Sequence, residues 1–206
     1  LHLNGNSNDS SGNGNNGTDT NITYSQANGK FGMGAGTFTT NPSNKYISIP
    51  MTGIPVGSSA RTMSFWIYIT SLTAGVEQDF IQYGTDSPGK IFGICVNTSL
   101  SNNWYLHFGG SYDTQTSTEI TTGSWKHVVL TYSGTVAVLY IDGIQVFSKS
   151  ISINTGSTSF YIGRHLANTV NGYNGKIDEV IIENRAWTAE EIKKYYTYSK
   201  GRFGIL

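Results

Sequence analysis

The chain has 206 residues with 13 basic and 13 acidic side chains, so its formal net charge is zero. Only 13% of the residues are charged and no basic cluster exceeds two adjacent charges, which argues against binding to nucleic acid or to anionic membranes. No apolar run approaches the roughly 20 residues of a membrane span, so we expect no membrane insertion. The length and the turn-rich, neutral composition indicate one all-β domain over residues 1–206.

The cysteine content adds a second constraint. Cys95 is the one cysteine, which excludes an internal disulfide, and its apolar flanks in residues 91–96 predict a small buried side chain. A disulfide-free domain with a neutral polar surface favours a bacterial, phage or viral surface protein, so we expect an extracellular, cell-surface or virion-surface location. The chain begins at Leu1 rather than Met, and we expect it to be a mature fragment or one domain of a longer protein.

Residues 4–21 form a polar tract rich in Asn, Ser and Gly, with a short strand-like segment on each side. One interpretation is a disordered linker, which this composition allows. The other is an ordered loop in which Asn and Gly residues adopt left-handed backbone conformations. The flanking segments favour the ordered loop.

Strand patterns then recur at spacings typical of a β-sandwich. Alternation in residues 63–69 predicts two distinct faces, one of Met63, Phe65, Ile67 and Ile69 and the other of Ser64, Trp66 and Tyr68. The dipeptide Asp142-Gly143 predicts a two-residue hairpin turn, because such turns need positive φ at both positions. Further strands are expected at residues 46–49, 80–83, 91–96, 104–108, 125–132, 137–141, 144–147, 159–163 and 175–182.

One helix is predicted, near the end of the chain. Thr188 and Glu191 have the spacing of a capping box, in which each side chain satisfies a backbone N–H group of the first turn. Ile192, Tyr195 and Tyr196 fall on one side of the helix and give it an apolar face. The sequence shows no internal repeat and no second domain.

Three motifs occur in chain order. Residues 1–18 contain a strand followed by Asp-x-Ser-Gly-x-Gly, residues 125–143 contain Trp-x-His-Val and Tyr-x-Asp-Gly, and residues 175–192 contain Gly-x-Ile-Asp-Glu-Val followed by Arg-Ala and Glu-Ile. Together they resemble the laminin G-like, concanavalin A-like jelly-roll family. The resemblance implies a two-sheet antiparallel jelly-roll sandwich, with one convex and one concave sheet and one short C-terminal helix. It does not imply one function, because such folds host lectins, hydrolases, adhesins and passive modules.

The resemblance also implies a metal. Relatives often hold a structural calcium ion between the N-terminal loop and the closing strand, and oxygen ligands of carboxylates, amides and the backbone suit Ca²⁺. The candidate ligands are Asp9, Asn13, Asn15 and Asp178. The alternative is structural, with Asp9 forming an Asx-turn and Asp178 acting as a hydrogen-bonded residue of a strand end.

Two groups of acidic residues are candidates for catalytic carboxylates. Laminarinase-type glycoside hydrolases share this architecture and carry Glu-x-Asp-x-x-Glu, whereas this chain has Glu77-x-Asp79-x-x-Gln82 and lacks the last acid that a paired-carboxylate mechanism needs. Alternation in residues 177–183 predicts that neighbouring carboxylates face opposite ways, with Glu179, Ile181 and Glu183 on one side and Asp178, Val180 and Ile182 on the other. We therefore interpret these acids as structural and assign no catalytic residue.

Neither cysteine nor histidine chemistry has better support. Cys95 lies among apolar neighbours in the sequence, without the polar setting that activates a thiol. The four histidines, His2, His107, His127 and His165, share no metal-ligand spacing. His127 lies within a predicted strand, where we interpret it as a structural residue.

Glycan binding remains. Sugar sites use aromatic faces for stacking and amides, carboxylates or Arg for the hydroxyl groups. Residues of the predicted loops and concave face could supply such groups: Trp104, Tyr112, Asp113, Arg164, His165, Asn171 and Tyr173. Aromatic residues also fill sandwich cores, and Trp66 and Trp125 fit that role better.

These patterns favour a non-catalytic surface module that recognises carbohydrate or mediates adhesion. The alternative is a structural or decoration domain of a phage, viral or cell-surface assembly, which would contact protein. A glycoside hydrolase is the third hypothesis, and the missing acid argues against it. The expected partners are a glycan or a surface protein, with oligomerisation arising through a parent protein.

Overall fold

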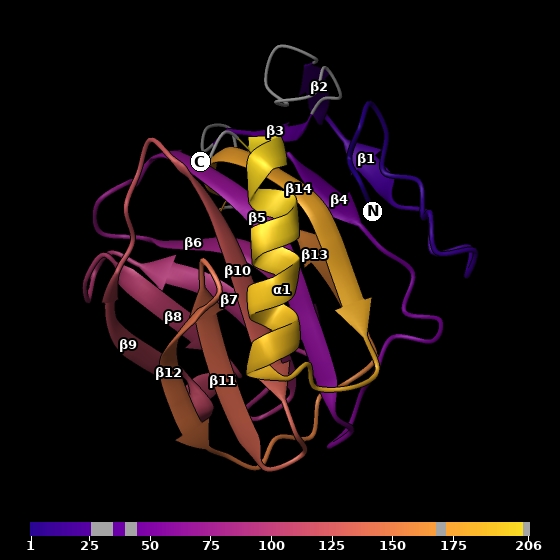
Figure 1. The fold of residues 1–206 in the computed structure, drawn as a ribbon. Coiled ribbons are helices and arrows are strands. Elements are labelled where there is room, and N and C mark those ends of the chain that lie inside the picture. The colour runs from indigo at the N-terminus through magenta and orange to yellow at the C-terminus, as the bar shows by residue number, and fades with distance from the viewer. Residues whose placement is uncertain (26–34, 40–44, 168–171, 204–206) are drawn as a thin grey trace.

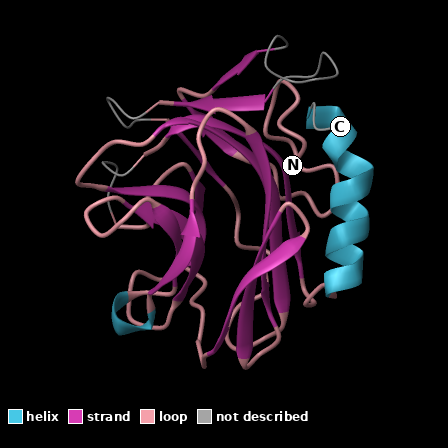
Figure 2. Cartoon of the chain, turned by 60° about the vertical axis from the view of Figure 1, so that its left-hand side comes forward, coloured by secondary structure: helices cyan, strands magenta, loops and turns pink. Residues whose placement is uncertain are grey.

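The protein is a sandwich of two antiparallel seven-stranded sheets, as the sequence predicts (Figures 1 and 2). The computed structural model describes residues 1–25, 35–39, 45–167 and 172–203. One helix, α1 (Ala189–Ser199), lies along the outer face of one sheet. Short 3₁₀ helices occupy Gly110–Tyr112 and Lys200–Phe203.

The sheet without the helix is called here the open sheet. Its strands run in the order β1-β4-β13-β6-β7-β8-β9 and comprise Thr18–Thr20, Tyr46–Ser48, Ser159–Ile162, Glu77–Gly84, Ile91–Asn97, Asn103–His107 and Thr114–Glu119. The sheet beneath the helix is called the covered sheet. Its order is β12-β11-β10-β5-β14-β3-β2, with strands Ile144–Ser150, Val136–Ile141, Trp125–Tyr132, Arg61–Ser71, Asn174–Glu183, Ala35–Phe38 and Thr23–Ser25.

The strands predicted from residue 46 onward are all present, whereas the segment expected as a strand at residues 1–3 is not a regular strand. Four short strands have no clear signal in the sequence. These are β1, β2, β3 and β9, which lie at or near the edges of the two sheets. Three of them have only three or four residues, and β9 is built mainly from Thr, Gln and Ser. Polar edge strands carry little apolar periodicity, so pattern analysis misses them.

Strand β5 shows how alternation builds the molecule. Its side chains Met63, Phe65 and Ile67 are fully buried in the core between the sheets, as predicted. Trp66, on the opposite face, is equally buried, but its ring stacks 5.9 Å from the ring of Tyr196 in the helix. The central strand of the covered sheet is therefore enclosed on both faces.

The predicted hairpin joins β11 to β12. Asp142 and Gly143 both have positive φ, of 53° and 78°, as the two-residue turn requires. The Asp142 carboxylate also accepts hydrogen bonds from the His127 backbone N–H, at 3.0 Å, and from the Lys126 ammonium, at 2.9 Å. The turn is thus tied to the neighbouring strand β10.

The helix begins with the predicted capping box. Thr188 Oγ1 accepts a hydrogen bond from the Glu191 backbone N–H, and the Glu191 carboxylate accepts one from the Thr188 backbone N–H. Ile192 is fully buried and packs in a cluster with Val129 and Trp187. Within the described ranges, no helix has the length and apolar character required to cross a membrane.

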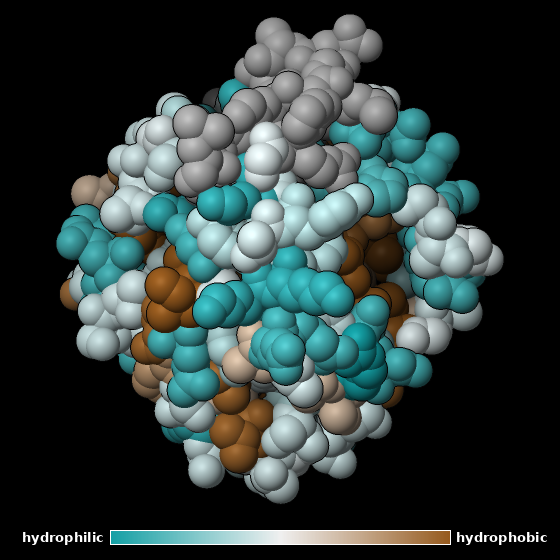
Figure 3. Space-filling model, in the orientation of Figure 1, coloured by the Kyte–Doolittle hydropathy of each residue, from teal (hydrophilic) through white to brown (hydrophobic). Residues whose placement is uncertain are grey.

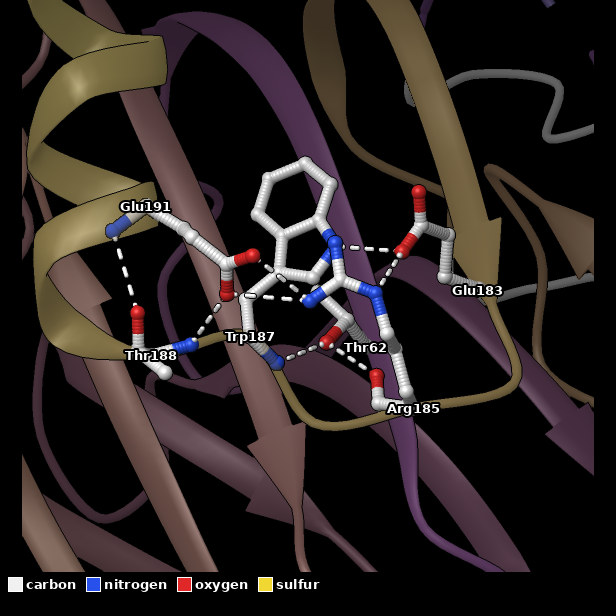
Figure 4. A network of polar contacts seen from close by, with 6 residues as sticks. All are labelled: Thr62, Glu183, Arg185, Trp187, Thr188 and Glu191. Atoms are coloured by element: carbon white, nitrogen blue, oxygen red, sulfur yellow. Dashed lines mark hydrogen bonds and ion pairs between the residues drawn. The ribbon is translucent and has the colours of Figure 1, made fainter.

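A polar network fixes the segment that connects β14 to the helix (Figure 4). The buried Thr62 hydroxyl donates to the Arg185 carbonyl oxygen at 2.7 Å and accepts from the Trp187 backbone N–H at 2.9 Å. The Trp187 indole N–H donates to Glu183 at 2.6 Å, and the Arg185 guanidinium bridges Glu183 and Glu191. These contacts hold the helix over the covered sheet.

The alternation predicted for residues 177–183 is wrong in part. A β-bulge between Asp178 and Ile181 places Glu179 at a φ of 51° and interrupts the period of two. Asp178 and Ile181 pair with Trp66 and Ser64 and so face the helix side. Asp178 therefore does not share a face with Val180, which reaches the core.

The N-terminal tract is an ordered loop rather than a linker. The Leu1 amine donates to the Val180 carbonyl oxygen at 2.8 Å, and the Val180 N–H donates to the Leu1 carbonyl oxygen at 2.9 Å. Leu3 is buried in the core, although residues 1–3 are not a regular strand. The first residues and β14 are thus joined directly, at the bulge.

His127 makes stability depend on pH. It is fully buried on β10, its Nε2 lies 2.9 Å from Ser64 Oγ, and burial lowers its pKa to about 3. Because the unfolded chain binds a proton near pH 6.5 and the folded chain does not, stability falls as the pH drops below about 6.5. We expect proton binding at His127 in the unfolded chain to lower the free energy of unfolding by about 2 kcal/mol between about pH 7 and pH 5.

Urea unfolding of the wild type and of His127→Gln at these two pH values measures the effect. The variant should lose about 2 kcal/mol less than the wild type on acidification. Equal losses in both proteins would show that His127 is not held neutral by the fold.

Candidate functional site

The outer face of the open sheet carries a group of ionisable side chains. Asp79 on β6 is paired with Cys95 on β7, and Gln82 of β6 is paired with Gly93, which in turn opposes His107 of β8. Cross-strand partners share a face, so strand register brings Asp79 and His107 to the same surface although they are 28 positions apart in the sequence. Cys95 is buried, as predicted.

Glu77, Asp79, His107 and His165 converge at this surface. One ligand-type atom from each lies within 4.8 Å of those of the other three. His107 Nδ1 is 3.6 Å from Glu77 Oε1 and 3.6 Å from Asp79 Oδ1, and His165 Nε2 is 3.9 Å from Glu77 Oε1. The two imidazole rings stack with their centroids 5.1 Å apart.

Burial makes this group unusual. Asp79 is 1% exposed, and neither of its carboxylate oxygens has a hydrogen-bond partner among the described residues. Burial, followed by the charge of Asp79, raises the pKa of Glu77 to about 7. Burial lowers the pKa of His107, but its interactions with Asp79, Asp113 and Glu77 outweigh this effect and raise the pKa overall. Both shifts favour the protonated forms, as expected where carboxyl groups are crowded together.

Asp113 supports His107 from the other side of the ring. Its Oδ1 accepts hydrogen bonds from the backbone N–H groups of Phe108, at 2.7 Å, and Gly109, at 2.5 Å. Its Oδ2 lies 3.9 Å from His107 Nε2. The predicted ligand-binding residue Asp113 thus lies next to the cluster, behind the His107 ring.

Arg164 and two tyrosines adjoin the cluster. The Arg164 guanidinium carbon lies 4.8 Å from the ring centre of Tyr46 and 4.4 Å from that of Tyr161. Its carbonyl oxygen accepts a hydrogen bond of 3.1 Å from the side-chain amide of Gln82, which pairs with Tyr161 across the sheet. The face therefore combines aromatic rings, a guanidinium, carboxylates and imidazoles, which together can bind polar and apolar parts of one ligand.

Three of the predicted ligand-binding residues, Asp113, Arg164 and His165, lie in or beside this group. Tyr112 is 38% exposed on the short 3₁₀ helix, where its ring packs over Gly89. Asn171 lies outside the described residues.

Two of the predictions are wrong, because Trp104 and Tyr173 belong to the core. Trp104 is 1% exposed, with its ring 5.8 Å from that of Phe80. Tyr173 is fully buried and stacks on Phe38 at 5.1 Å. Both side chains fill the space between the sheets and cannot stack on a ligand at the surface.

The sequence does not predict Tyr46, Tyr161 or His107 as members of the site. It predicts a structural role for Glu77 and Asp79. Tyr46 and Tyr161 alternate with core residues in their strands, which marks them as outward-facing. The order of the strands in the sheet brings Tyr46 and Tyr161 next to Arg164, and sequence patterns do not predict strand order.

A second polar region lies at the N-terminal loop. A cavity of about 600 Å³ is bounded by Asp9, Asn13 and Asn15 on the loop side and by Glu179 on the side of β14. Figure 3 shows a recess with an apolar floor beside the helix on this side of the molecule, where Val180, Ile181 and Ile182 line the cavity. Three of the four predicted calcium ligands thus line one cavity.

The fourth predicted ligand, Asp178, does not line this cavity, and its Oδ1 accepts a hydrogen bond from the adjacent Glu179 N–H. The Asp9 carboxylate accepts from the backbone N–H groups of Ser11 and Asn15, so it does form the Asx-turn of the structural alternative. Carboxylate and amide oxygens still dominate the polar lining, and this donor set fits a hard cation such as Ca²⁺.

A smaller groove of about 350 Å³ lies beside the helix. Its walls include Trp187, Tyr195 and Tyr198, with Arg185, Lys194 and Glu191 at its margin. Tyr198 is 83% exposed. Aromatic and charged side chains thus line this helix groove together.

The sequence matches the family model described as the concanavalin A-like lectin/glucanases superfamily over residues 39–193. The chain belongs to this superfamily. Membership agrees with the jelly-roll sandwich and with the expectation drawn from the three sequence motifs. No curated protein matches the sequence.

Solved structures of the superfamily fold include binding modules. The binding domain of Paraclostridial Mosquitocidal Protein 1 is 21% identical with a TM-score of 0.71, over 93% of this chain and 49% of that chain. Domain 4 of AbnA, an extracellular arabinanase from Geobacillus stearothermophilus solved with arabinotriose, is 22% identical with a TM-score of 0.70, over 92% of both chains. A putative carbohydrate binding protein from Bacteroides ovatus is 21% identical with a TM-score of 0.61, over 78% of this chain and 46% of that chain.

These identities establish a shared fold. The chain spans about half the length of the mosquitocidal and Bacteroides chains, and 29% of the similar Trypanosoma rangeli sialidase. In these neighbours the matching sandwich is one part of a longer chain. Two of the longer chains are named as binding domains, those of Paraclostridial Mosquitocidal Protein 1 and of Botulinum Neurotoxin serotype G.

Proposed function

We propose that the chain is a non-catalytic carbohydrate-binding module whose sugar site is the outer face of the open sheet. The observation that carries this proposal is the placement of the Arg164 guanidinium over the rings of Tyr46 and Tyr161. The next residue, His165, faces the Glu77 carboxylate at 3.9 Å. Superfamily membership and neighbours that bind carbohydrate support it.

The chemistry of the face suits a sugar. Tyrosine rings offer apolar surface to the C–H patches of a pyranose or furanose ring, and the Arg164 guanidinium donates several hydrogen bonds in a fixed plane. Glu77 and the imidazoles can accept from or donate to hydroxyl groups. The helix lies along the outer face of the covered sheet, whereas no α-helix of the described chain lies on the outer face of the open sheet (Figure 2).

Glycoside hydrolysis is not part of the proposal. The position of the last acid in the laminarinase-type motif is Gln82, whose amide donates to the Arg164 carbonyl oxygen. An amide cannot transfer a proton to a leaving group, so the pair of acids that such hydrolysis needs is incomplete.

We propose that the module acts outside the cell or at a cell or virion surface, where it provides adhesion for a larger protein.

A glycan array that includes arabino-oligosaccharides and sialylated glycans tests the sugar site. We expect saturable binding that falls by roughly tenfold or more in Arg164→Ala and in Tyr161→Ala, because each loses about 1–2 kcal/mol of contact. Tyr198→Ala, in the helix groove, is the matched control and should bind as the wild type does. Loss of binding in Tyr198→Ala alone would show that the sugar site is the helix groove. No binding to any glycan of the array would favour a passive structural domain.

We also propose that Ca²⁺ binds the N-terminal cavity and stabilises the fold. Asp9, Asn13, Asn15 and Glu179 would hold the ion, which would join the N-terminal loop to β14 beside the Leu1–Val180 hydrogen bonds.

Thermal unfolding with Ca²⁺ and with EGTA tests this site. At about 100 times the dissociation constant, the ion should add about 2.7 kcal/mol, a rise of roughly 5–10 °C in Tm for a domain of this size. Asp9→Asn should abolish the rise, while Asp86→Asn, at an exposed position, should retain it. An unchanged Tm on adding Ca²⁺ would rule out a stabilising calcium site.

A further inference from the structure

We propose that Glu77, Asp79 and His107 form a binding site for a divalent transition-metal ion, with Zn²⁺ as the preferred ion. The site lies on the outer face of the open sheet and is separate from the calcium cavity at the N-terminal loop. The geometry and burial of the three side chains define this site, and metal binding there requires no sugar.

The spacing of the side chains suits a small ion. A tetrahedral Zn²⁺ with bonds of about 2.0–2.1 Å to nitrogen and oxygen holds its ligand atoms about 3.3–3.4 Å apart. His107 Nδ1 lies 3.6 Å from Glu77 Oε1 and 3.6 Å from Asp79 Oδ1. The ligand atoms of Glu77 and Asp79 also lie within 4.8 Å of one another, so the three side chains surround a space that a small contraction would fit to the ion.

Burial provides the second and independent observation. Both oxygens of Asp79 and Nδ1 of His107 are buried, and none of these atoms has a hydrogen-bond partner in the described parts of the chain. Leaving a buried carboxylate without such partners is costly, and native proteins compensate buried charge by pairing it or by coordinating a metal. A cation between these atoms would satisfy all of them together.

Asp113 prepares His107 for this role. Metal-bound histidines usually direct their other ring nitrogen to a carboxylate or carbonyl oxygen, which fixes the tautomer. Here Nε2 of His107 faces Asp113 Oδ2 at 3.9 Å, and Asp113 is held by two backbone N–H groups. A proton on Nε2 would face Asp113, and the Nδ1 lone pair would then be directed at the two carboxylates.

His165 stands at the fourth position and is not one of the fixed ligands. Its Nδ1 accepts a hydrogen bond of 3.0 Å from the Ala167 backbone N–H, so the proton of the neutral ring is on Nε2. That nitrogen faces Glu77 at 3.9 Å. His165 can ligate the ion only after the bond from Ala167 is released, so the site has three fixed ligands and one open position.

The donor set selects the class of ion. Calcium prefers roughly six to eight oxygen ligands, whereas an imidazole with two carboxylates suits zinc and its neighbours in the first transition row. The alternative is that His107 is protonated. As an imidazolium it would pair with Glu77 and Asp79, and no metal would be needed. The two accounts differ in whether the protein binds Zn²⁺ with a defined stoichiometry.

Isothermal titration of the chelator-treated full chain with Zn²⁺ tests the proposal. We expect one ion per chain, with affinity reduced by roughly 100-fold or more in Asp79→Asn and in His107→Ala and by about 10–100-fold in Asp113→Asn. His165→Ala should change the affinity by less than about tenfold, because His165 is not a fixed ligand. His2→Ala removes a histidine near the N-terminal cavity and serves as the control with unchanged affinity.

A second readout separates loss of the site from loss of the fold. Thermal unfolding of each metal-free variant shows whether it is folded, and Co²⁺ gives the visible absorption of a tetrahedral site only when the ligands are intact. No Zn²⁺ binding by the wild type, or full stoichiometric binding by folded Asp79→Asn and His107→Ala, would overturn the proposal in favour of the imidazolium.

Discussion

The structure depends on one apolar core shared by two sheets. Nearly every strand turns alternate side chains into this core, so the other side chains of the strands lie on the two outer faces. The helix, its capping box and the polar network around Thr62 close one of these faces. The outer face of the open sheet is left for other residues, and it is there that carboxylates, imidazoles and a tyrosine-bound guanidinium collect.

The two faces differ in the charge of their buried polar groups. Under the helix, the Thr62 hydroxyl and the Trp187 indole have hydrogen-bond partners, and His127, whose Nδ1 has none among the described residues, is kept neutral by burial. On the open sheet, the Asp79 carboxylate is buried without such partners, and Glu77 is held close to it. Like charges in a buried position weaken a fold, and such groups are typical of sites where a ligand or ion completes the arrangement.

Local patterns predicted those parts of the molecule that local chemistry controls. Alternation in residues 63–69, the Asp142-Gly143 turn and the capping box at Thr188 depend on neighbours in the chain, and the structure confirms them. The candidate site depends on strand order and on bulges: β7 lies between β6 and β8, and a bulge after Asp79 alters the period of β6. The sequence predicts Trp104 as a ligand-binding residue, because the burial of its side chain and the face of the sheet on which it lies depend on how the sheets pack together.

The central claim is that the outer face of the open sheet is arranged for binding at the expense of stability. The thermal unfolding of Glu77→Gln in the presence of chelator, at about pH 8, tests it most directly, with the exposed Glu119→Gln as the matched control. Because burial and Asp79 raise the Glu77 pKa to about 7, the ionised carboxylate is disfavoured in the fold, and the variant should have the higher Tm. A lower Tm in Glu77→Gln than in wild type would show that the carboxylate stabilises the fold, and would contradict the account.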